Sequence, residues 1–149
     1  MIIRPAAPAD HAEWLRMRLN LWGGAAEEHT HDMDAYFSGQ QDRRTFVVER
    51  PASGLCGFIE VSLRNYAEGC ITSPVAYIEG WYVDEDSRRR TLGTRLVQAA
   101  EAWARRNGLK EIASDTQIAN VVSIQAHKVL GYEEVERIVC FRKRLDARG

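Results

Sequence analysis

The stretch from residue 75 to residue 107 constrains the fold most, because it joins an apolar strand to a helix through a basic loop. Residues 75–83 (VAYIEGWYV) have the apolar character of a buried strand. Three consecutive arginines at 88–90 follow in the loop, which opens into a helix at Leu92. Free N–H groups in a first helical turn, at the positive end of the helix dipole, attract anions. Gly93 lets the backbone approach a bulky phosphate. The pattern predicts a ligand that carries a pyrophosphate.

The rest of the chain alternates strands and helices over 149 residues, the length of one domain. We expect strands at 2–4, 45–49, 55–63, 75–83 and 111–116, and one or two closing strands within 134–144. Helices are expected at 8–22, 26–37, from 92 to the stop at 107–108, and from 120 to 131. Their inward faces are expected at Leu15, Leu19 and Trp22, at Leu92, Leu96, Ala100 and Trp103, and at Val122, Ala126, Val129 and Leu130. This order predicts a single α/β (α+β) domain, 1–149, with one sheet of mixed direction.

Composition excludes several classes of partner. Lys and Arg number 20 against 21 Asp and Glu, so no overall basic field indicates nucleic acid. No apolar run is long enough to cross a membrane, and the N-terminus lacks a signal peptide's apolar region. The three cysteines form no CxxC, which favours free thiols in a reduced, cytoplasmic protein. His29 and His31 are two residues apart on a helix and face different ways, so we expect a solvated surface and no metal.

Several side chains have both a functional and a structural interpretation. Glu79 lies in an apolar strand, where a carboxylate without a partner is costly, so a functional role is favoured over a structural ion pair. Tyr66, in a polar loop, is favoured as a contact residue. Trp22 is explained equally well as a core residue at a helix end and as a contact residue. Asp115 is explained equally well as the cap of a turn and as a site residue. Glu136 taken alone is more often solvated.

The basic loop also carries a family resemblance. Arg88-Arg-Arg-Thr91-Leu-Gly93 is similar to the Gln/Arg-x-x-Gly-x-Gly/Ala loop of GNAT acetyltransferases, with Thr91 in place of the first glycine. The resemblance implies a mostly antiparallel, twisted sheet that splays between its central strands to hold acetyl-CoA, with a bulge near Gly80. It also implies a set of cofactor contacts: Trp81, Tyr82 and Val83 toward pantetheine and the thioester, Arg89, Arg90, Thr91, Leu92, Gly93 and Thr94 around the pyrophosphate, and Asn120 farther along the cleft.

Shorter blocks narrow the resemblance to bacterial aminoglycoside 6'-N-acetyltransferases. They are 21–22, 64–66 with 69–70, 78–80, 113–116, 126–127 and 135–137, and only their joint occurrence is specific. The resemblance implies that the substrate contacts are Trp22, Tyr66, Glu79, Asp115 and Glu136. Glu27 and Glu28 would extend this acidic rim for a polycation.

The expected reaction is direct attack of a neutral amine on the thioester in a ternary complex, with an N–H near Val83 facing the oxyanion. Glu79, Asp115 and His127 are the candidate catalytic residues, although His127 is more readily explained as a histidine packed on its helix. We expect a homodimer that needs acetyl-CoA and no metal. The alternatives are a GNAT enzyme for another polyamine or a protein N-terminus, and a non-catalytic acyl-CoA-binding module.

Overall fold

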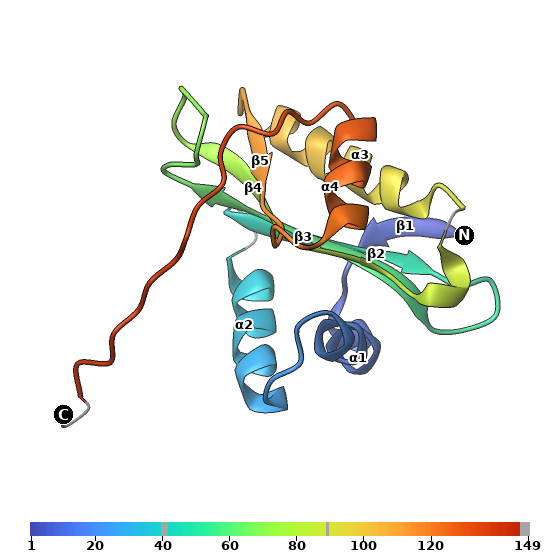
Figure 1. Cartoon of the computed structure of the whole chain (residues 1–149). Helices are drawn as coiled ribbons and strands as arrows, with labels where there is room; N and C mark the ends of the chain where they lie inside the picture. The colour runs from blue at the N-terminus through green and yellow to red at the C-terminus, as the bar shows by residue number, and fades with distance from the viewer. Residues whose placement is uncertain (40–41, 89, 147–149) are drawn as a thin grey trace. The chain divides into compact units, whose positions relative to one another are not determined.

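A computed structural model describes residues 1–39, 42–88 and 90–146. The chain divides into two compact units, Met1–Asp115 and Thr116–Gly149. The first unit is built on a five-stranded sheet with the order β1-β2-β3-β4-β5 (Figure 1). The strands are β1 (Ile2–Pro5), β2 (Arg43–Glu49), β3 (Leu55–Arg64), β4 (Val75–Val83) and β5 (Ile112–Ser114). Neighbours from β1 to β4 are antiparallel and β5 is parallel to β4, which confirms a mixed, mostly antiparallel sheet.

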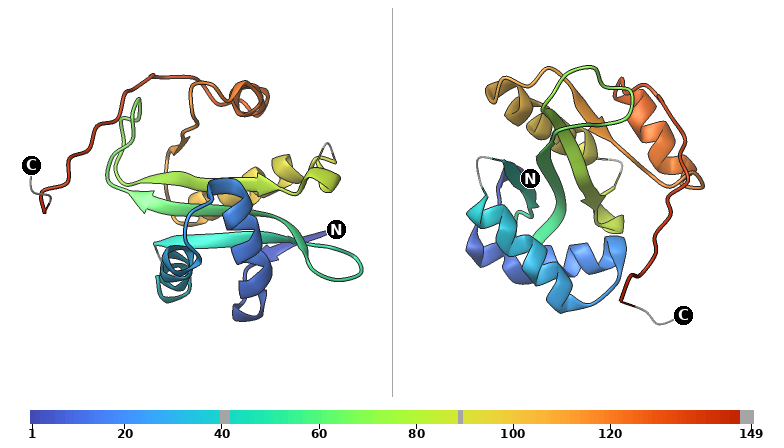
Figure 2. Two further views of the ribbon diagram at one scale, coloured as in Figure 1. Left: turned by 60° about the horizontal axis from the view of Figure 1, so that its bottom comes forward. Right: turned by 90° about the vertical axis from the view of Figure 1, so that its left-hand side faces the viewer.

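Helices cover both faces of this sheet. Helices α1 (His11–Trp22), after a 3-10 turn at Pro8–Asp10, and α2 (Ala26–Ser38) lie on one face, and α3 (Leu92–Arg106) lies on the other (Figures 1 and 2). Between α1, α2 and the sheet is a core of aromatic and aliphatic side chains: Trp14, Met17, Met33, Tyr36, Val47, Leu55 and Phe58. On the opposite face α3 buries Leu92, Leu96, Ala100 and Trp103, as its periodicity predicts.

The buried face of α1 differs from the expected one. Its buried residues are Trp14, Met17 and Arg18, whereas Trp22 is 45 % exposed. The expected stripe through Leu15, Leu19 and Trp22 is therefore wrong by one residue. The reason is that Arg18, polar in any hydrophobicity pattern, is buried here by pairing with a carboxylate of the sheet.

Within its described residues, 116–146, the second unit contains one helix, α4 (Val121–Val129), which begins after Asn120 as predicted. None of its residues is buried, and the expected inward face is wrong at Val122 and Val129, which are more than 80 % exposed, whereas Ala126 and Leu130 are half-buried. Residues 134–144 form no strand within the described part of the chain, so the expected closing strands are also wrong. A strand needs a neighbour for its backbone hydrogen bonds, and this unit, taken by itself, offers none.

Candidate active site

A β-bulge on β4 sets the position of Glu79. Glu60 of β3 pairs with Gly80 of β4, but the next residue, Val61, pairs with Ile78. Glu79 is thus the extra residue, and a bulge of this kind re-aims the side chain of the residue that it inserts. The structure confirms an irregularity at the position where Gly80 predicts one, and it identifies Glu79 as the inserted residue.

The same point of β4 is where β5 leaves it. Among the described residues, the parallel pairing of these strands covers Ala76–Ile78 on β4 and Ile112–Ser114 on β5. The last residues of β4, from Glu79 to Val83, therefore extend beyond the partner on that edge. This unpaired end of β4 lies where the family resemblance implies that the sheet splays.

The loop after β4 is fixed at its start by a buried carboxylate. Asp84 is 6 % exposed and accepts two hydrogen bonds from Arg16, at 3.0 and 2.9 Å, and one from Arg50 at 3.0 Å. The Tyr82 hydroxyl donates to the same carboxylate at 3.0 Å. Burial alone would raise the pKa of Asp84, but the hydrogen bonds from Arg16 and Arg50 outweigh it and hold the pKa below its usual value. The basic loop therefore starts from a rigid anchor at the end of β4.

The start of α3 has the conformation that a phosphate cradle needs. Thr91 precedes the helix in the left-handed region, at φ 62°, which L residues with a Cβ rarely adopt. None of the described side chains caps the first turn, whose N–H groups belong to Leu92, Gly93 and Thr94. Arg90 is exposed at the entry to the helix, and Arg89 lies outside the described residues. Thr91 thus takes a backbone conformation that glycine adopts without strain.

Other predicted cofactor residues make contacts within the protein. The Trp81 indole donates to the Gly93 carbonyl at 3.1 Å, and a Cβ at Gly93 would lie 3.3 Å from the Trp81 ring. Gly93 therefore lets α3 pack closely on β4, in addition to any contact with a phosphate. The Val83 carbonyl accepts from Arg88 at 2.8 Å. These contacts hold the end of β4 and the start of α3 together.

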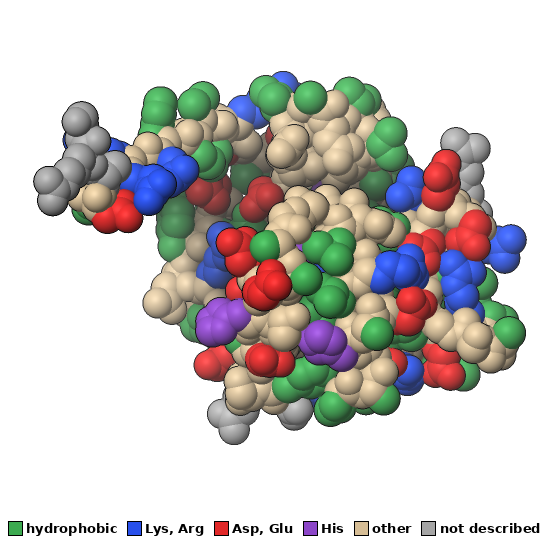
Figure 3. Space-filling view, turned by 90° about the horizontal axis from the view of Figure 1, so that it is seen from below, with side chains coloured by type: hydrophobic (Ala, Val, Ile, Leu, Met, Phe, Trp, Pro, Cys, Tyr) green, Lys and Arg blue, Asp and Glu red, His purple; other side chains and the backbone are tan. Residues whose placement is uncertain are grey.

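A pocket of about 720 Å³ opens beside the bulge, within the first unit. Its volume suits a small-molecule substrate. The lining residues come from α1, the α1–α2 connection, α2 and the three central strands: Arg18, Trp22, Gly23, Gly24, Glu28, His29, Asp32, Tyr36, Arg43, Glu60, Ser62, Leu63, Arg64 and Glu79. Figure 3 shows acidic and histidine side chains gathered on the face that carries these helices.

One wall of the pocket is a buried ion pair. Glu60, 1 % exposed, accepts from Arg18 at 2.6 Å and from the Trp14 indole at 2.9 Å. Burial raises the pKa of Glu60, and Arg18 opposes this. Arg18 also donates to His29 Nδ1 at 3.1 Å, so His29 Nε2 carries the proton that it donates to the Gly23 carbonyl at 2.5 Å. His29 is thus buried and structural, which corrects the solvated surface expected for it, while His31 is exposed.

A second carboxylate of the pocket, Glu79, forms an ion pair with Arg64. Arg64 donates to both Glu79 oxygens, at 2.9 and 2.6 Å, and the Ser62 hydroxyl donates at 2.5 Å. Asp115, at the end of β5, accepts from the Tyr77 hydroxyl at 2.5 Å. Burial, together with this hydrogen bond, raises the pKa of Tyr77. Glu79 and Asp115 are therefore both held in hydrogen bonds within the first unit.

Trp22 forms another wall of the pocket and packs on the bulge. A Cβ on Gly80 would lie 2.5 Å from the Trp22 ring, so glycine lets this ring pack directly on the strand. The Trp22 ring also stacks on His29 at 6.1 Å between ring centroids, and the Arg18 guanidinium lies 4.7 Å from its centroid. Trp22 is thus a half-exposed aromatic wall rather than a core residue.

The remaining predicted site residues lie in the loop after β3 and in the second unit. Tyr66 is 67 % exposed in the loop after β3 and does not line it. Asn120, His127 and Glu136 belong to the second unit. Within that unit Asn120 caps α4 by accepting from the Ser123 amide at 3.0 Å, and His127 Nδ1 donates to the Ser123 carbonyl at 2.7 Å. Glu136 is exposed.

Sequence reasoning assigned no site role to five charged residues of the pocket: Arg18, Asp32, Arg43, Glu60 and Arg64. A signal existed for Glu60, which interrupts the apolar run 55–63 as Glu79 interrupts its own strand. Arg18 precedes Trp22 by four residues and therefore shares its face of α1. Arg64 lies in the block 64–66 that carries the resemblance, but the resemblance implies no role for it.

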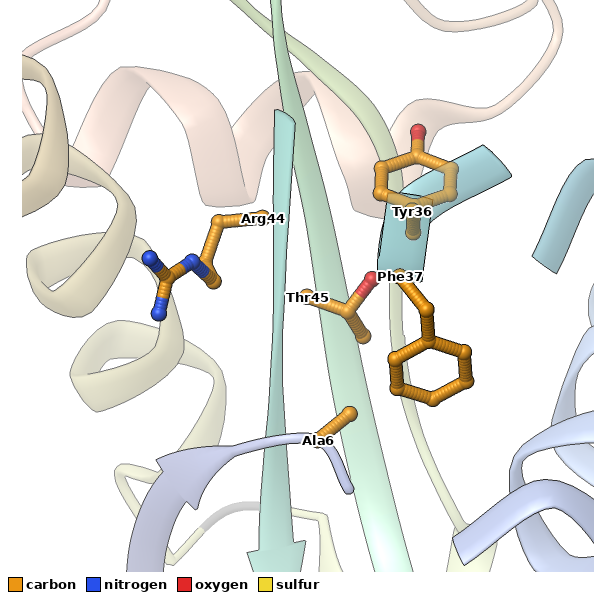
Figure 4. Close-up of a pocket in the computed structure, with 5 residues that line it drawn as sticks. All are labelled: Ala6, Tyr36, Phe37, Arg44 and Thr45. Carbon is orange, nitrogen blue, oxygen red and sulfur yellow. The ribbon is translucent and has the colours of Figure 1, made fainter. Parts of the chain in front are cut away.

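A second cavity, of about 30 Å³, lies under α2 and is lined by Ala6, Tyr36, Phe37, Arg44 and Thr45 (Figure 4). Within the described residues, the buried Thr45 hydroxyl oxygen has no hydrogen-bond partner. A volume of this size holds about one water molecule, which would satisfy the hydroxyl, and it excludes a substrate.

Comparison with known proteins agrees with this geometry. Residues 11–132 match the acetyltransferase (GNAT) family. The chain is 43 % identical over 147 residues to an aminoglycoside N(6')-acetyltransferase type 1 of Klebsiella aerogenes, covering 97 % of both chains. It is 38 % identical over 148 residues to the enzyme of the same name from Stenotrophomonas maltophilia, covering 97 % of this chain and 94 % of the other.

Solved structures give the same result. The chain superposes with a TM-score of 0.90, at 33 % identity, on the apo aminoglycoside 6'-N-acetyltransferase AAC(6')-IG of Acinetobacter haemolyticus, covering 98 % of this chain and all of that one. AAC(6')-Iy in complex with a CoA-aminoglycoside bisubstrate analogue gives a TM-score of 0.89 at 32 % identity and covers 96 % of this chain and 97 % of that one. The chain belongs to the GNAT acetyltransferase family.

Proposed function

We propose that the protein transfers an acetyl group from acetyl-CoA to the 6'-amine of aminoglycosides of the kanamycin and tobramycin type, and so confers resistance. The observation that carries this proposal is the pocket beside the bulge, which places Glu79 where β4 and β5 part. The relatives named above, similar over nearly the whole chain, carry this activity in their names and support the same substrate here.

The donor side of the proposal rests on β4 and the start of α3. Pantetheine lies along Trp81, Tyr82 and Val83, where β4 extends beyond β5. The pyrophosphate is held by the first-turn amides of α3 and by the loop from Arg89 to Thr94, where Thr91 is in the left-handed conformation. Asn120 contacts the cofactor in the sequence-based prediction, and its capping bond at α4 is compatible with that role.

The acceptor side rests on carboxylates and aromatic walls. Glu79 and Asp115 bind and orient the ammonium groups, Trp22 supports a sugar face, and Tyr66 and Glu136 complete the contacts. An attacking amine must be neutral, so Glu79 receives its proton directly or through water. With the amine in line, its lone pair forms the C–N bond to the thioester carbonyl.

Charge on the carbonyl oxygen is stabilised by an N–H near Val83 as the tetrahedral intermediate forms. The C–S bond then breaks, and the electron pair leaves on the CoA sulfur, which takes a proton from the amine side or from His127. The acetyl group moves directly from CoA to the amine in a ternary complex, so it is never attached to the protein.

Two properties accompany this proposal as predictions. The first is a homodimer: the second unit exposes apolar side chains at Val135, Ile138, Val139, Phe141 and Leu145, which a second copy would cover. The second is a cytoplasmic location, where acetyl-CoA is available. None of the described helices has the length and apolarity of a membrane-spanning segment.

A substrate panel tests the proposed function. CoA release from acetyl-CoA is measured with kanamycin, spermidine and an amino-terminal peptide offered separately. We expect turnover with kanamycin that exceeds the rate with either other amine by at least about a hundredfold. Turnover on the peptide alone or on spermidine alone would refute the proposal that aminoglycosides are the substrates. Binding of acetyl-CoA without turnover on any amine would indicate a non-catalytic binding module.

A further inference from the structure

The pocket beside the bulge is less acidic than a polycation site should be. Its described lining holds four carboxylates and also three guanidiniums: Glu28, Asp32, Glu60 and Glu79 with Arg18, Arg43 and Arg64. Each guanidinium reduces the attraction of the pocket for an ammonium group. The arginines therefore need an explanation that the proposed function does not supply.

The three arginines differ in how they are held. Arg18 is 4 % exposed and inseparable from the buried Glu60. Arg43 lies over the Tyr36 ring, 5.3 Å from its centroid. Arg64 is different, because its half-exposed guanidinium donates to both oxygens of Glu79, the inserted residue of the bulge. The side chains of Arg64 and Glu79 are 43 % and 24 % exposed, so water reaches this pair, whereas the Arg18–Glu60 pair is closed to it.

We propose that Arg64 is a displaceable internal cation, which occupies Glu79 until an ammonium group of the substrate replaces it. This proposal rests on the proposed function, since it concerns how the same carboxylate receives its amine. Arg64 keeps Glu79 hydrogen-bonded in the free protein, and every amine that uses Glu79 must compete with it. A substrate with several ammonium groups can offset the free energy needed to displace Arg64, because its other ammonium groups bind elsewhere in the site.

The structure also provides a place for Arg64 after displacement. Its guanidinium lies 3.5 Å from the centroid of the Tyr77 ring, and the Tyr77 hydroxyl donates to Asp115. The hydrogen bond to Glu79 raises the pKa of Arg64 and burial opposes it, while the charges of Glu79, Tyr77 and, last, Asp115 raise it further. A guanidinium that leaves Glu79 can thus slide along the ring face toward a second carboxylate. Glu79 meanwhile keeps the hydrogen bond from Ser62.

The test removes the guanidinium and then returns it as a free molecule. In Arg64→Ala, we expect the KM for kanamycin to fall about fivefold, with kcat within about twofold. Methylguanidine should bind the empty position, be a competitive inhibitor against kanamycin, and restore the KM of the unmodified protein. Its binding is also measured by NMR titration without any amine substrate, so that this result does not depend on turnover.

Arg43→Ala is the matched control, because it removes the same charge from the same pocket without touching the recorded contacts of Glu79. A fall in KM that is equal in both variants would show a general charge effect and would refute the displacement. A KM that rises or a kcat that collapses in Arg64→Ala would show that Arg64 orients Glu79, which also overturns it. Absence of acetylation by the unmodified protein would refute the proposed function, whereas methylguanidine binding selective for Arg64→Ala would still support the contact.

Discussion

Gly80→Ala probes the contact between α1 and the bulge, because its new Cβ has a defined obstacle. The Cβ would lie 2.5 and 2.7 Å from two carbons of the Trp22 ring and 3.3 Å from the Phe58 ring. Carbon atoms in ordinary contact are about 3.5–4.0 Å apart, so the indole must recede by roughly 1 Å. Trp22 is 45 % exposed at the end of α1 and can move outward.

The expected cost follows from this freedom to move. Overpacking typically costs about 1–3 kcal/mol, and we expect the lower half of that range for a half-exposed ring. In a Trp22→Ala background the same substitution should cost less than about 0.5 kcal/mol, because only the Phe58 contact remains tight. The unmodified protein, the two single variants and the double variant form a double-mutant cycle. Alanine lowers the entropy of the unfolded chain equally with and without Trp22, so this effect cancels when the two costs of Gly80→Ala are compared.

Two assays read this cycle. Urea unfolding of the four proteins gives the change in the free energy of unfolding, and steady-state kinetics gives the KM of each substrate. We expect Gly80→Ala to raise the KM for kanamycin about tenfold and to leave the KM for acetyl-CoA within about twofold, since Trp22 lines the acceptor pocket. Equal costs of Gly80→Ala with and without Trp22 would refute the contact as the cause.

Three further predictions address the loop, its anchor and the bulge carboxylate. Thr91→Gly should stabilise the protein by about 0.5–1 kcal/mol in urea unfolding, because it relieves a β-branched residue at φ 62°; a loss of stability would contradict this. Asp84→Asn should cost about 3 kcal/mol by leaving Arg16 and Arg50 without their buried partner. The pKa of Asp84 is lowered in the folded protein, so the ionised carboxylate stabilises the fold above the unfolded pKa of about 4. This stabilisation is lost as pH falls through the folded pKa. The free energy of unfolding of Asp84→Asn should therefore fall less steeply in acid than that of the unmodified protein. Glu79→Gln should lower kcat/KM about a hundredfold, and a kcat/KM within about twofold of the unmodified protein would exclude Glu79 as the group that receives the proton.

The regular elements of the first unit could be predicted because their signals are local. The strand 75–83 and the buried face of α3 follow from periodicity, and the Pro51–Gly54 turn marks the β2–β3 hairpin. The buried face of α1 could not be predicted, because hydrophobic periodicity treats Arg18 as a solvated residue. Its burial depends on Glu60, 42 positions away in the sequence.

The sequence identified residues of the candidate site by their type, but it did not show how they are arranged around the bulge. An acid in an apolar strand singled out Glu79, and the structure places that acid as the inserted residue of a bulge beside Gly80 and Trp22. Its partner Arg64 was beyond prediction, because which side chains face one another across β3 and β4 depends on the register of the bulge. Alternation in residues 134–144 indicated strands, but alternation cannot supply the neighbour that a strand requires.

The most direct test of the whole account compares neomycin with paromomycin, two aminoglycosides that differ by an amine or a hydroxyl at the 6' position. CoA release from acetyl-CoA is followed with each compound at equal concentration, and the product is identified by mass spectrometry. The account predicts rapid, single acetylation of neomycin and turnover of paromomycin that is lower by at least about a thousandfold. Comparable acetylation of both compounds would contradict attack by the 6'-amine at the β4 bulge.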